Sequence, residues 1–168
     1  YYKLSLDEME DNYDALIGIA VCMLEMEQFA ESLEYIGRAM KINDTLSDAW
    51  VYMAEAYIGI DNMDDALKAY LKAISIDPNQ ADTLLAIGNI YMDNAEFQLA
   101  GKYYEAAFSM DATLENIELF LAVANYYTGN YVETAAYLKQ ALSRNLDAAQ
   151  LFLELCPGAE KTFLSTDK

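Results

Sequence analysis

The sequence repeats with a period of 34 residues, and this period constrains the fold more than any other feature. The four windows begin at Tyr13, Ser47, Ala81 and Glu115. Small residues recur at the eighth position of the windows, as Ala20, Ala54, Gly88 and Ala122, and at the twenty-seventh, as Ala39, Ala73, Ala107 and Ala141. Small side chains at fixed positions let two helices approach closely, so each window is expected to form one packed unit.

Large apolar residues fill the spaces between these small ones. The seventh position holds Ile19, Met53, Ile87 and Leu121, and the seventeenth holds Phe29, Met63, Phe97 and Tyr131. Within each window the apolar residues follow i, i+3, i+4 and i+7 spacing over two stretches of about a dozen residues, which indicates helices and not strands. Short polar breaks such as Asp61-Asn62 and Gly129-Asn130 separate the two stretches. Each window is therefore predicted to be a helical hairpin.

The windows resemble tetratricopeptide repeats. The second window is the most similar, because it carries the signature residues Trp50, Tyr57, Ala66, Tyr70, Ala73 and Pro78. The resemblance implies an all-α fold, a right-handed superhelical α-solenoid of helix-turn-helix hairpins. We expect repeats at 13–46, 47–80, 81–114 and 115–148, preceded at 1–12 by the tail of an earlier helix or an N-terminal extension, and followed at 149–168 by a capping helix and tail.

The fourth window departs from the pattern at three positions. Glu118 replaces a large apolar residue, Asn125 stands at the eleventh position, and Leu146 replaces the proline. Terminal repeats face water on one side, so these residues are expected to be solvent-facing. The segment from Ala148 to Cys156 resembles the first helix of a fifth hairpin and is expected to cap the array.

Composition narrows the classes of partner. The chain has 28 acidic and 10 basic residues, a formal charge of −18, which repels nucleic acid and anionic lipid headgroups. No apolar run of about 18 residues is present, so no membrane insertion is expected. The chain begins with Tyr1 in a segment similar to the end of a second helix, which indicates a piece of a longer protein. A cytoplasmic location is the default expectation.

No motif for catalysis or for a cofactor is present. The chain has no histidine, which is the usual base for a Ser or Cys nucleophile, and it has no glycine-rich phosphate loop. Cys22 and Cys156 lie far apart, so a zinc site would lack ligands, and both thiols are expected to be buried. The sequence predicts a protein that is not an enzyme and holds neither metal nor cofactor.

The resemblance also implies where a partner binds. In the family, first helices line a concave groove, and ligand contacts come from the second, fifth, ninth, twelfth and thirteenth positions of each repeat. From these positions we predict the partner-binding residues Asp48, Val51, Glu55, Asp82, Leu85, Asn89, Asp93, Leu119, Val123, Tyr126 and Tyr127.

Charge is segregated between the two helices of each hairpin. The first fourteen residues of each window contain two acidic residues and no Lys or Arg, whereas the basic residues of the repeats lie on second helices. The groove is thus predicted to attract cationic segments and to exclude anionic ones. Asp14, Asp48 and Asp82 have an alternative explanation, since a carboxylate in the first turn of a helix is stabilised by the helix dipole. This explanation does not extend to Glu55 and Asp93.

Three functions stay open. The first is a scaffold that binds a basic and apolar segment of a partner protein. The second is a structural spacer or self-association module of a longer repeat protein, and the third is a small secretion-type chaperone. Some relatives bind acidic C-termini of heat-shock chaperones with a clamp of Lys, Arg and Asn, but Asn89 is the only such residue in this groove, so no binding of those peptides is expected. Tyr126 and Tyr127 either contact the partner or pack against the capping helix.

Overall fold

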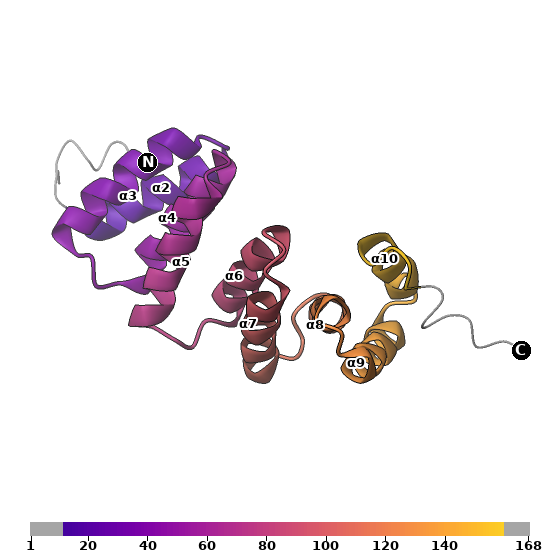
Figure 1. The fold of residues 1–168 in the computed structure, drawn as a ribbon. Helices are drawn as coiled ribbons and strands as arrows, with labels where there is room; N and C mark the ends of the chain where they lie inside the picture. The colour runs from indigo at the N-terminus through magenta and orange to yellow at the C-terminus, as the bar shows by residue number, and fades with distance from the viewer. Residues whose placement is uncertain (1–11, 160–168) are drawn as a thin grey trace, which may run out of the picture. The chain divides into compact units, whose positions relative to one another are not determined.

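The computed structural model describes residues 12–159, in which every regular element is a helix. The expected preceding tail at 1–11 and the final tail from residue 160 lie outside the described residues. The helices are α2 (Tyr13–Glu25), α3 (Phe29–Ile42), α4 (Ser47–Gly59), α5 (Met63–Ile76), α6 (Ala81–Asp93), α7 (Phe97–Met110), α8 (Ile117–Tyr127), α9 (Tyr131–Arg144) and α10 (Ala148–Leu155). The all-α class and the helical pairs predicted from the 34-residue period are confirmed (Figure 1).

The four hairpin turns share one backbone geometry. A residue with positive φ follows the first helix of each hairpin, and these residues lie 34 positions apart at Glu27, Asp61, Ala95 and Gly129. The next residue donates its backbone N–H five positions back, as in the 2.8 Å bond from Glu96 N to Tyr91 O. This bond closes the end of the first helix in the manner of a Schellman motif. The chain can then reverse within three residues, so the two helices of a hairpin run side by side.

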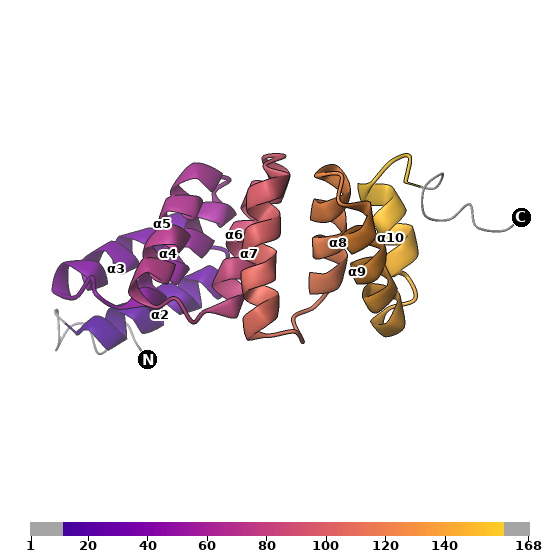
Figure 2. The same cartoon turned by 60° about the horizontal axis from the view of Figure 1, so that its bottom comes forward.

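The chain divides into two compact units, an N-terminal unit through Thr83 and a C-terminal unit from Leu84. In the N-terminal unit, α3 packs against both α2 and α4, and α4 pairs with α5 (Figures 1 and 2). Ala20, Ile36 and Ala56 are fully buried at the centre of this unit. Their small or branched side chains come from three different helices, which fixes the stacking of the first two hairpins.

In the C-terminal unit, the small residue Gly88 brings α6 and α7 close together. A Cβ atom at this position would lie 2.5 Å from the ring of Tyr104, which is fully buried. Helix α7 packs in turn against α8, and α8 pairs with α9. The eighth-position glycine therefore acts as the sequence pattern predicts, by making room for a large side chain of the second helix.

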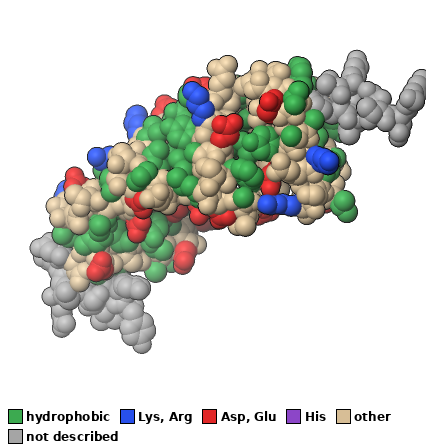
Figure 3. Space-filling model, turned by 90° about the horizontal axis from the view of Figure 1, so that it is seen from below, with side chains coloured by type: hydrophobic (Ala, Val, Ile, Leu, Met, Phe, Trp, Pro, Cys, Tyr) green, Lys and Arg blue, Asp and Glu red, His purple; other side chains and the backbone are tan. Residues whose placement is uncertain are grey.

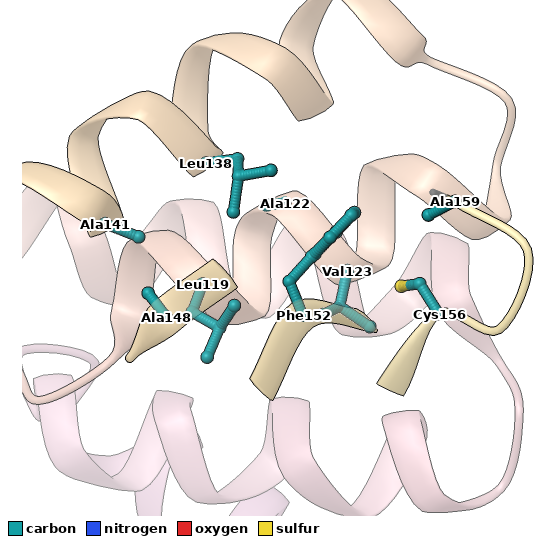
Figure 4. Close-up of a cluster of buried hydrophobic side chains, with 9 residues drawn as sticks. All are labelled: Leu119, Ala122, Val123, Leu138, Ala141, Ala148, Phe152, Cys156 and Ala159. Atoms are coloured by element: carbon teal, nitrogen blue, oxygen red, sulfur yellow. The ribbon is translucent and has the colours of Figure 1, made fainter. Parts of the chain in front are cut away.

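Helix α10 covers α8 and α9 and completes the core of the C-terminal unit. Phe152 of α10 points into a buried cluster that includes Leu119, Val123 and Leu138 (Figure 4). Cys156 closes the same cluster, and burial raises the pKa of its thiol to about 12. Helix α10 lies in the segment that we expected to cap the array, and it packs against α8 and α9.

Three sequence-based expectations of exposure and burial are wrong. Glu118 is only 2% exposed, and its Oε1 lies 3.0 Å from Nη1 of Arg144, which compensates its buried charge. Asn125 is 8% exposed, and its amide donates to the Leu121 carbonyl at 2.9 Å. Partners within the unit satisfy both side chains, so neither faces water. Cys22 is exposed and not buried, whereas Leu146 is exposed as expected.

Candidate partner-binding sites

The structure collects four of the predicted binding residues in one pocket of the N-terminal unit. This acidic pocket has a volume of about 400 Å³ and is lined by Asp48, Val51, Tyr52, Glu55, Asn79, Gln80, Ala81, Asp82 and Thr83. It lies between one face of α4 and the first turn of α6. Three of its nine lining residues are acidic, so a cation is the species that it fits best.

Helical spacing explains how α4 contributes to the acidic pocket. Asp48, Val51 and Glu55 are separated by three and four residues, so they share one face of the helix. Asp48 and Asp82 lie in the first turns of α4 and α6, where the helix dipole favours a carboxylate. Glu55 lies in the second half of α4, where the dipole gives it no such support. Its position is therefore the one that indicates a role beyond helix stability.

No Lys or Arg of the described residues neutralises the charge of the acidic pocket. Within residues 12–159 the only pairs of a Lys or Arg with a carboxylate are Lys68–Asp65 and Arg144–Glu118, and neither lies in this pocket. Although Glu55 is exposed, the surrounding protein removes part of its hydration and raises the pKa of its carboxyl. Burial, together with the charges of Asp48 and Glu55, also raises the pKa of Tyr52. A cation that entered the pocket would relieve this unfavourable electrostatic state.

A second pocket lies in the C-terminal unit. This aromatic pocket has a volume of about 520 Å³ and is lined by Asn89, Met92, Asp93, Phe97, Tyr104, Phe120, Val123, Tyr127 and Leu155. The residues come from α6, α7, α8 and α10. Four of the nine are aromatic and one is acidic, so its chemistry differs from that of the acidic pocket.

Ring stacking and two hydrogen bonds hold the aromatic pocket in shape. Phe97 and Tyr127 stack with centroids 4.2 Å apart and planes at 11°, and Tyr104 stacks on Phe120 at 5.5 Å. The Tyr104 hydroxyl donates to Asn89 Oδ1 at 2.9 Å, and the Tyr127 hydroxyl donates to the Leu155 carbonyl at 2.6 Å. Burial raises the pKa of Tyr104, and the nearby charge of Asp93 raises it further. Contacts within the C-terminal unit thus hold the rings that line the pocket.

The two pockets account for eight of the eleven predicted residues. The acidic pocket contains Asp48, Val51, Glu55 and Asp82, and the aromatic pocket contains Asn89, Asp93, Val123 and Tyr127. Leu85, Leu119 and Tyr126 line neither of the two.

Helix α10 covers some of the residues of α8 that we predicted to bind a partner. Leu119 has no exposed surface and belongs to the cluster around Phe152, so it cannot contact a partner while α10 is in place. Val123 is 3% exposed and presents only an edge to the aromatic pocket. Tyr126 packs edge-on against Phe152, which matches the alternative of packing against the capping helix. Tyr127 also contacts the capping helix, since its hydroxyl donates to the Leu155 carbonyl, and its ring lines the aromatic pocket.

Sequence reasoning missed the aromatic residues that make up most of the second pocket. Phe97 occupies the seventeenth repeat position, and Tyr104 occupies the twenty-fourth, where large apolar residues also recur as Ile36, Tyr70 and Leu138. The helical pattern assigns both positions to packing between helices. Both do pack, and both also border the pocket. The concentration of aromatic residues in the third window and at Tyr126-Tyr127 was the available signal, but the contribution of Leu155 depends on the position of α10.

Comparisons with known proteins agree with this architecture. A family model described as TPR repeat matches residues 61–94, and one described as tetratricopeptide repeat matches residues 81–114. Human tetratricopeptide repeat protein 6 is 26% identical over 125 residues, which is 74% of this chain and 24% of that protein. The type IV pilus assembly protein PilF of Pseudomonas aeruginosa is 29% identical over 110 residues, which is 66% of this chain and 41% of that protein. The chain thus spans less than half the length of either relative.

A solved structure has the same fold. The crystal structure of YrrB, described as a TPR protein with an unusual peptide-binding site, superposes with a TM-score of 0.82 at 14% identity and covers 95% of this chain and 86% of that one. The two family models show that residues 61–114 carry tetratricopeptide repeats, and the similar proteins and the shared fold support a tetratricopeptide repeat protein.

Proposed function

We propose that the chain is a protein–protein interaction scaffold that binds a basic and apolar segment of a partner in the acidic pocket. The observation that carries the proposal is the group of Asp48, Glu55 and Asp82 around one pocket, with no Lys or Arg of residues 12–159 paired to them. The family supports the scaffold role, because its members are generally non-enzymatic proteins that bind protein or peptide partners.

The chemistry of the acidic pocket specifies the kind of segment. A lysine or arginine of the partner would bring a positive charge to Glu55, whose carboxylate is partly desolvated by the surrounding protein. Val51 and Tyr52 are half-buried and offer apolar contact beside the charges. Figure 3 shows acidic side chains exposed beside hydrophobic ones on the face in view. A segment with both basic and apolar residues therefore matches the pocket better than a purely charged one.

Selection from a library of random twelve-residue peptides tests this function. The native chain is expected to enrich peptides with Lys or Arg next to apolar residues and to deplete acidic ones. The double variant Asp48→Lys/Glu55→Lys is expected to lose the basic peptides because its pocket now repels them. Asp64→Lys/Glu105→Lys is the matched control, since both acids are exposed on second helices and outside the two pockets.

Two results of the peptide selection would count against the proposal. Enrichment of acidic peptides, or equal enrichment of basic peptides by the native chain and the pocket variant, would contradict the acidic-pocket proposal. Circular dichroism of each variant verifies that the helices are intact, so that a loss of binding reports on the pocket.

Self-association is the second candidate, and exposed apolar residues of the C-terminal unit favour it. Val132 is 79% exposed on α9, and Tyr131, Leu151 and Leu155 are exposed on α9 and α10. Exposed apolar patches often mark contacts between proteins. If this surface joins copies of the chain, sedimentation velocity will show a concentration-dependent dimer that the Val132→Glu/Leu151→Glu variant lacks. A chain that stays monomeric over the same concentrations would exclude this role.

A further inference from the structure

We infer that the aromatic pocket of the C-terminal unit takes one arginine side chain of the partner. The inference rests on the proposed function, because it assigns a second subsite for the same basic segment. It is carried by residues of the C-terminal unit alone, so it can fail while binding at the acidic pocket stands.

The aromatic pocket has the size of a ligand site. Its volume of about 520 Å³ falls within the roughly 300–1,000 Å³ of small-ligand pockets, which is enough for one long side chain and its neighbours. Tyr104 is fully buried and Phe120 half-buried, whereas Tyr127 and Asp93 are exposed. A side chain that entered would therefore pass exposed residues and meet buried rings.

The charge of the pocket selects a cation. Asp93 is the one carboxylate among its lining residues, and no Lys or Arg of the described chain forms an ion pair with it. The faces of aromatic rings carry partial negative charge and attract cations. Tyr127, which is 42% exposed, and the half-buried Phe97 supply such rings beside Asp93, whereas Tyr104 is fully buried and stacked on Phe120. An anionic side chain would meet repulsion from both sources.

The shape of the pocket favours arginine over lysine. A guanidinium group is planar, so it can lie flat on an aromatic ring and donate two parallel hydrogen bonds to a single carboxylate. Asn89 Oδ1 already accepts one hydrogen bond from Tyr104 and retains a second lone pair for a further donor. A lysine ammonium is more strongly hydrated, so its transfer into an apolar pocket costs more. The Asp93 carboxylate can thus accept the two parallel hydrogen bonds of the guanidinium, and an aromatic ring can contact its flat face.

Helix α10 is part of this subsite. Leu155 lines the pocket, and its carbonyl accepts the hydrogen bond that orients the Tyr127 ring. The ring that would stack on the guanidinium is therefore held by the capping helix. A chain that lacked α10 would keep Asp93 but lose one wall.

Titration with short peptides tests the inference. The probe is acetyl-Leu-Arg-Leu-amide, compared with its lysine counterpart and with its citrulline counterpart, which replaces the guanidinium by a neutral urea of similar shape. The full chain is labelled on its methionine methyl groups, and the Met92 signal is assigned with Met92→Leu, since Met92 lines the pocket. The arginine peptide is expected to shift Met92 saturably, the lysine peptide to bind several-fold more weakly, and the citrulline peptide to leave Met92 unshifted.

Two variants complete the test. Asp93→Asn keeps the side-chain shape and is expected to weaken arginine binding about tenfold, which corresponds to about 1.4 kcal/mol. Glu105→Gln is the control, because it removes one exposed negative charge from the same unit outside the pocket. Equal binding of the citrulline peptide, or unchanged binding by Asp93→Asn, would overturn the inference.

The two proposals can fail separately. If the arginine peptide leaves Met92 unshifted while library binding still depends on Asp48 and Glu55, the arginine subsite is wrong and the scaffold function stands. If basic peptides bind at neither pocket, both proposals fall.

Discussion

At the scale of single residues, each hairpin turn depends on one amino acid with a positive φ. Only the fourth turn uses glycine, at Gly129, while Glu27, Asp61 and Ala95 adopt the same region with φ between 57° and 60°. An L-residue with a Cβ atom pays about 1–2 kcal/mol for this conformation. The polar breaks in the sequence predicted where the turns lie. They did not predict which residue adopts the positive φ, because this depends on the backbone hydrogen bonds that close the first helix.

Ala95→Gly is expected to stabilise the protein. Glycine removes the strain at φ 59°, and its greater freedom in the unfolded chain offsets part of the gain. The net increase in the free energy of unfolding should be about 0.5–1 kcal/mol in urea titrations. Ala106→Gly, in the interior of α7, is the control and should lower stability by about 1 kcal/mol. A loss of stability in both variants would refute the strain argument.

Glu55 makes the N-terminal unit sensitive to pH. Partial desolvation by the surrounding protein raises the pKa of its carboxyl in the folded state, so the folded protein binds this proton more tightly than the unfolded chain does. The resulting stability is fully present below the unfolded-state pKa of about 4.3 and is lost as pH rises through the folded-state pKa. Glu55→Gln should therefore be more stable than the native chain at pH 7 and equally stable at pH 3. Urea titrations at both pH values decide this, with Glu34→Gln on the exposed face of α3 as the control.

At the scale of elements, the fourth hairpin is joined by an ion pair that no sequence pattern revealed. Glu118 of α8 is buried against Arg144 at the end of α9, and the same guanidinium donates to the Ala112 carbonyl at 2.6 Å. The two partners are 26 positions apart in the sequence, so no local motif reveals this contact. From the sequence, the polar residue Glu118 at an apolar repeat position indicated an exposed end of the array. In the structure it belongs to a buried ion pair.

Arg144→Met should be destabilising because it leaves the Glu118 carboxylate buried without a partner. Breaking a buried ion pair costs about 3–5 kcal/mol, and the half-exposed position of Arg144 reduces the expected loss to about 2 kcal/mol. The double variant Glu118→Leu/Arg144→Met should regain most of it, because Leu16 and Leu84 occupy the equivalent repeat position. Urea denaturation of the three proteins measures both effects. A double variant as unstable as the single one would show that the arginine acts through the Ala112 carbonyl and not through Glu118.

Helix α10 protects the thiol of Cys156, and this gives a direct readout of capping. Cys22 is exposed, whereas Cys156 is buried and burial raises its pKa to about 12. A thiol reagent at pH 8 should therefore label one cysteine quickly and the other slowly. Phe152→Ala removes the central ring of the cluster and should lower stability by about 3–5 kcal/mol while making Cys156 reactive. Slow labelling of Cys156 in that variant would mean that α10 holds its place without Phe152.

At the scale of the whole molecule, the 34-residue period was sufficient to predict the helices but not the surfaces they present. Gly88 and the small residues of the eighth position predicted close helix pairs, because packing of neighbouring helices depends on local spacing. Leu119 stood at a predicted binding position and is buried, because α10 lies over it. The acidic pocket was predictable because α4 carries Asp48, Val51 and Glu55 on one face. The aromatic pocket was not, because its walls come from four helices.

A charge exchange across the acidic pocket tests the central claim most directly. Calorimetric titration would compare a basic peptide selected by the native chain with the same peptide in which glutamate replaces each Lys and Arg. The native chain should bind only the basic peptide, and the Asp48→Lys/Glu55→Lys variant should lose it and gain the acidic one, because each pairing is set by complementary charge in the same pocket. Continued binding of the basic peptide by the charge-reversed variant, with native affinity, would contradict the account and place the partner elsewhere on the chain.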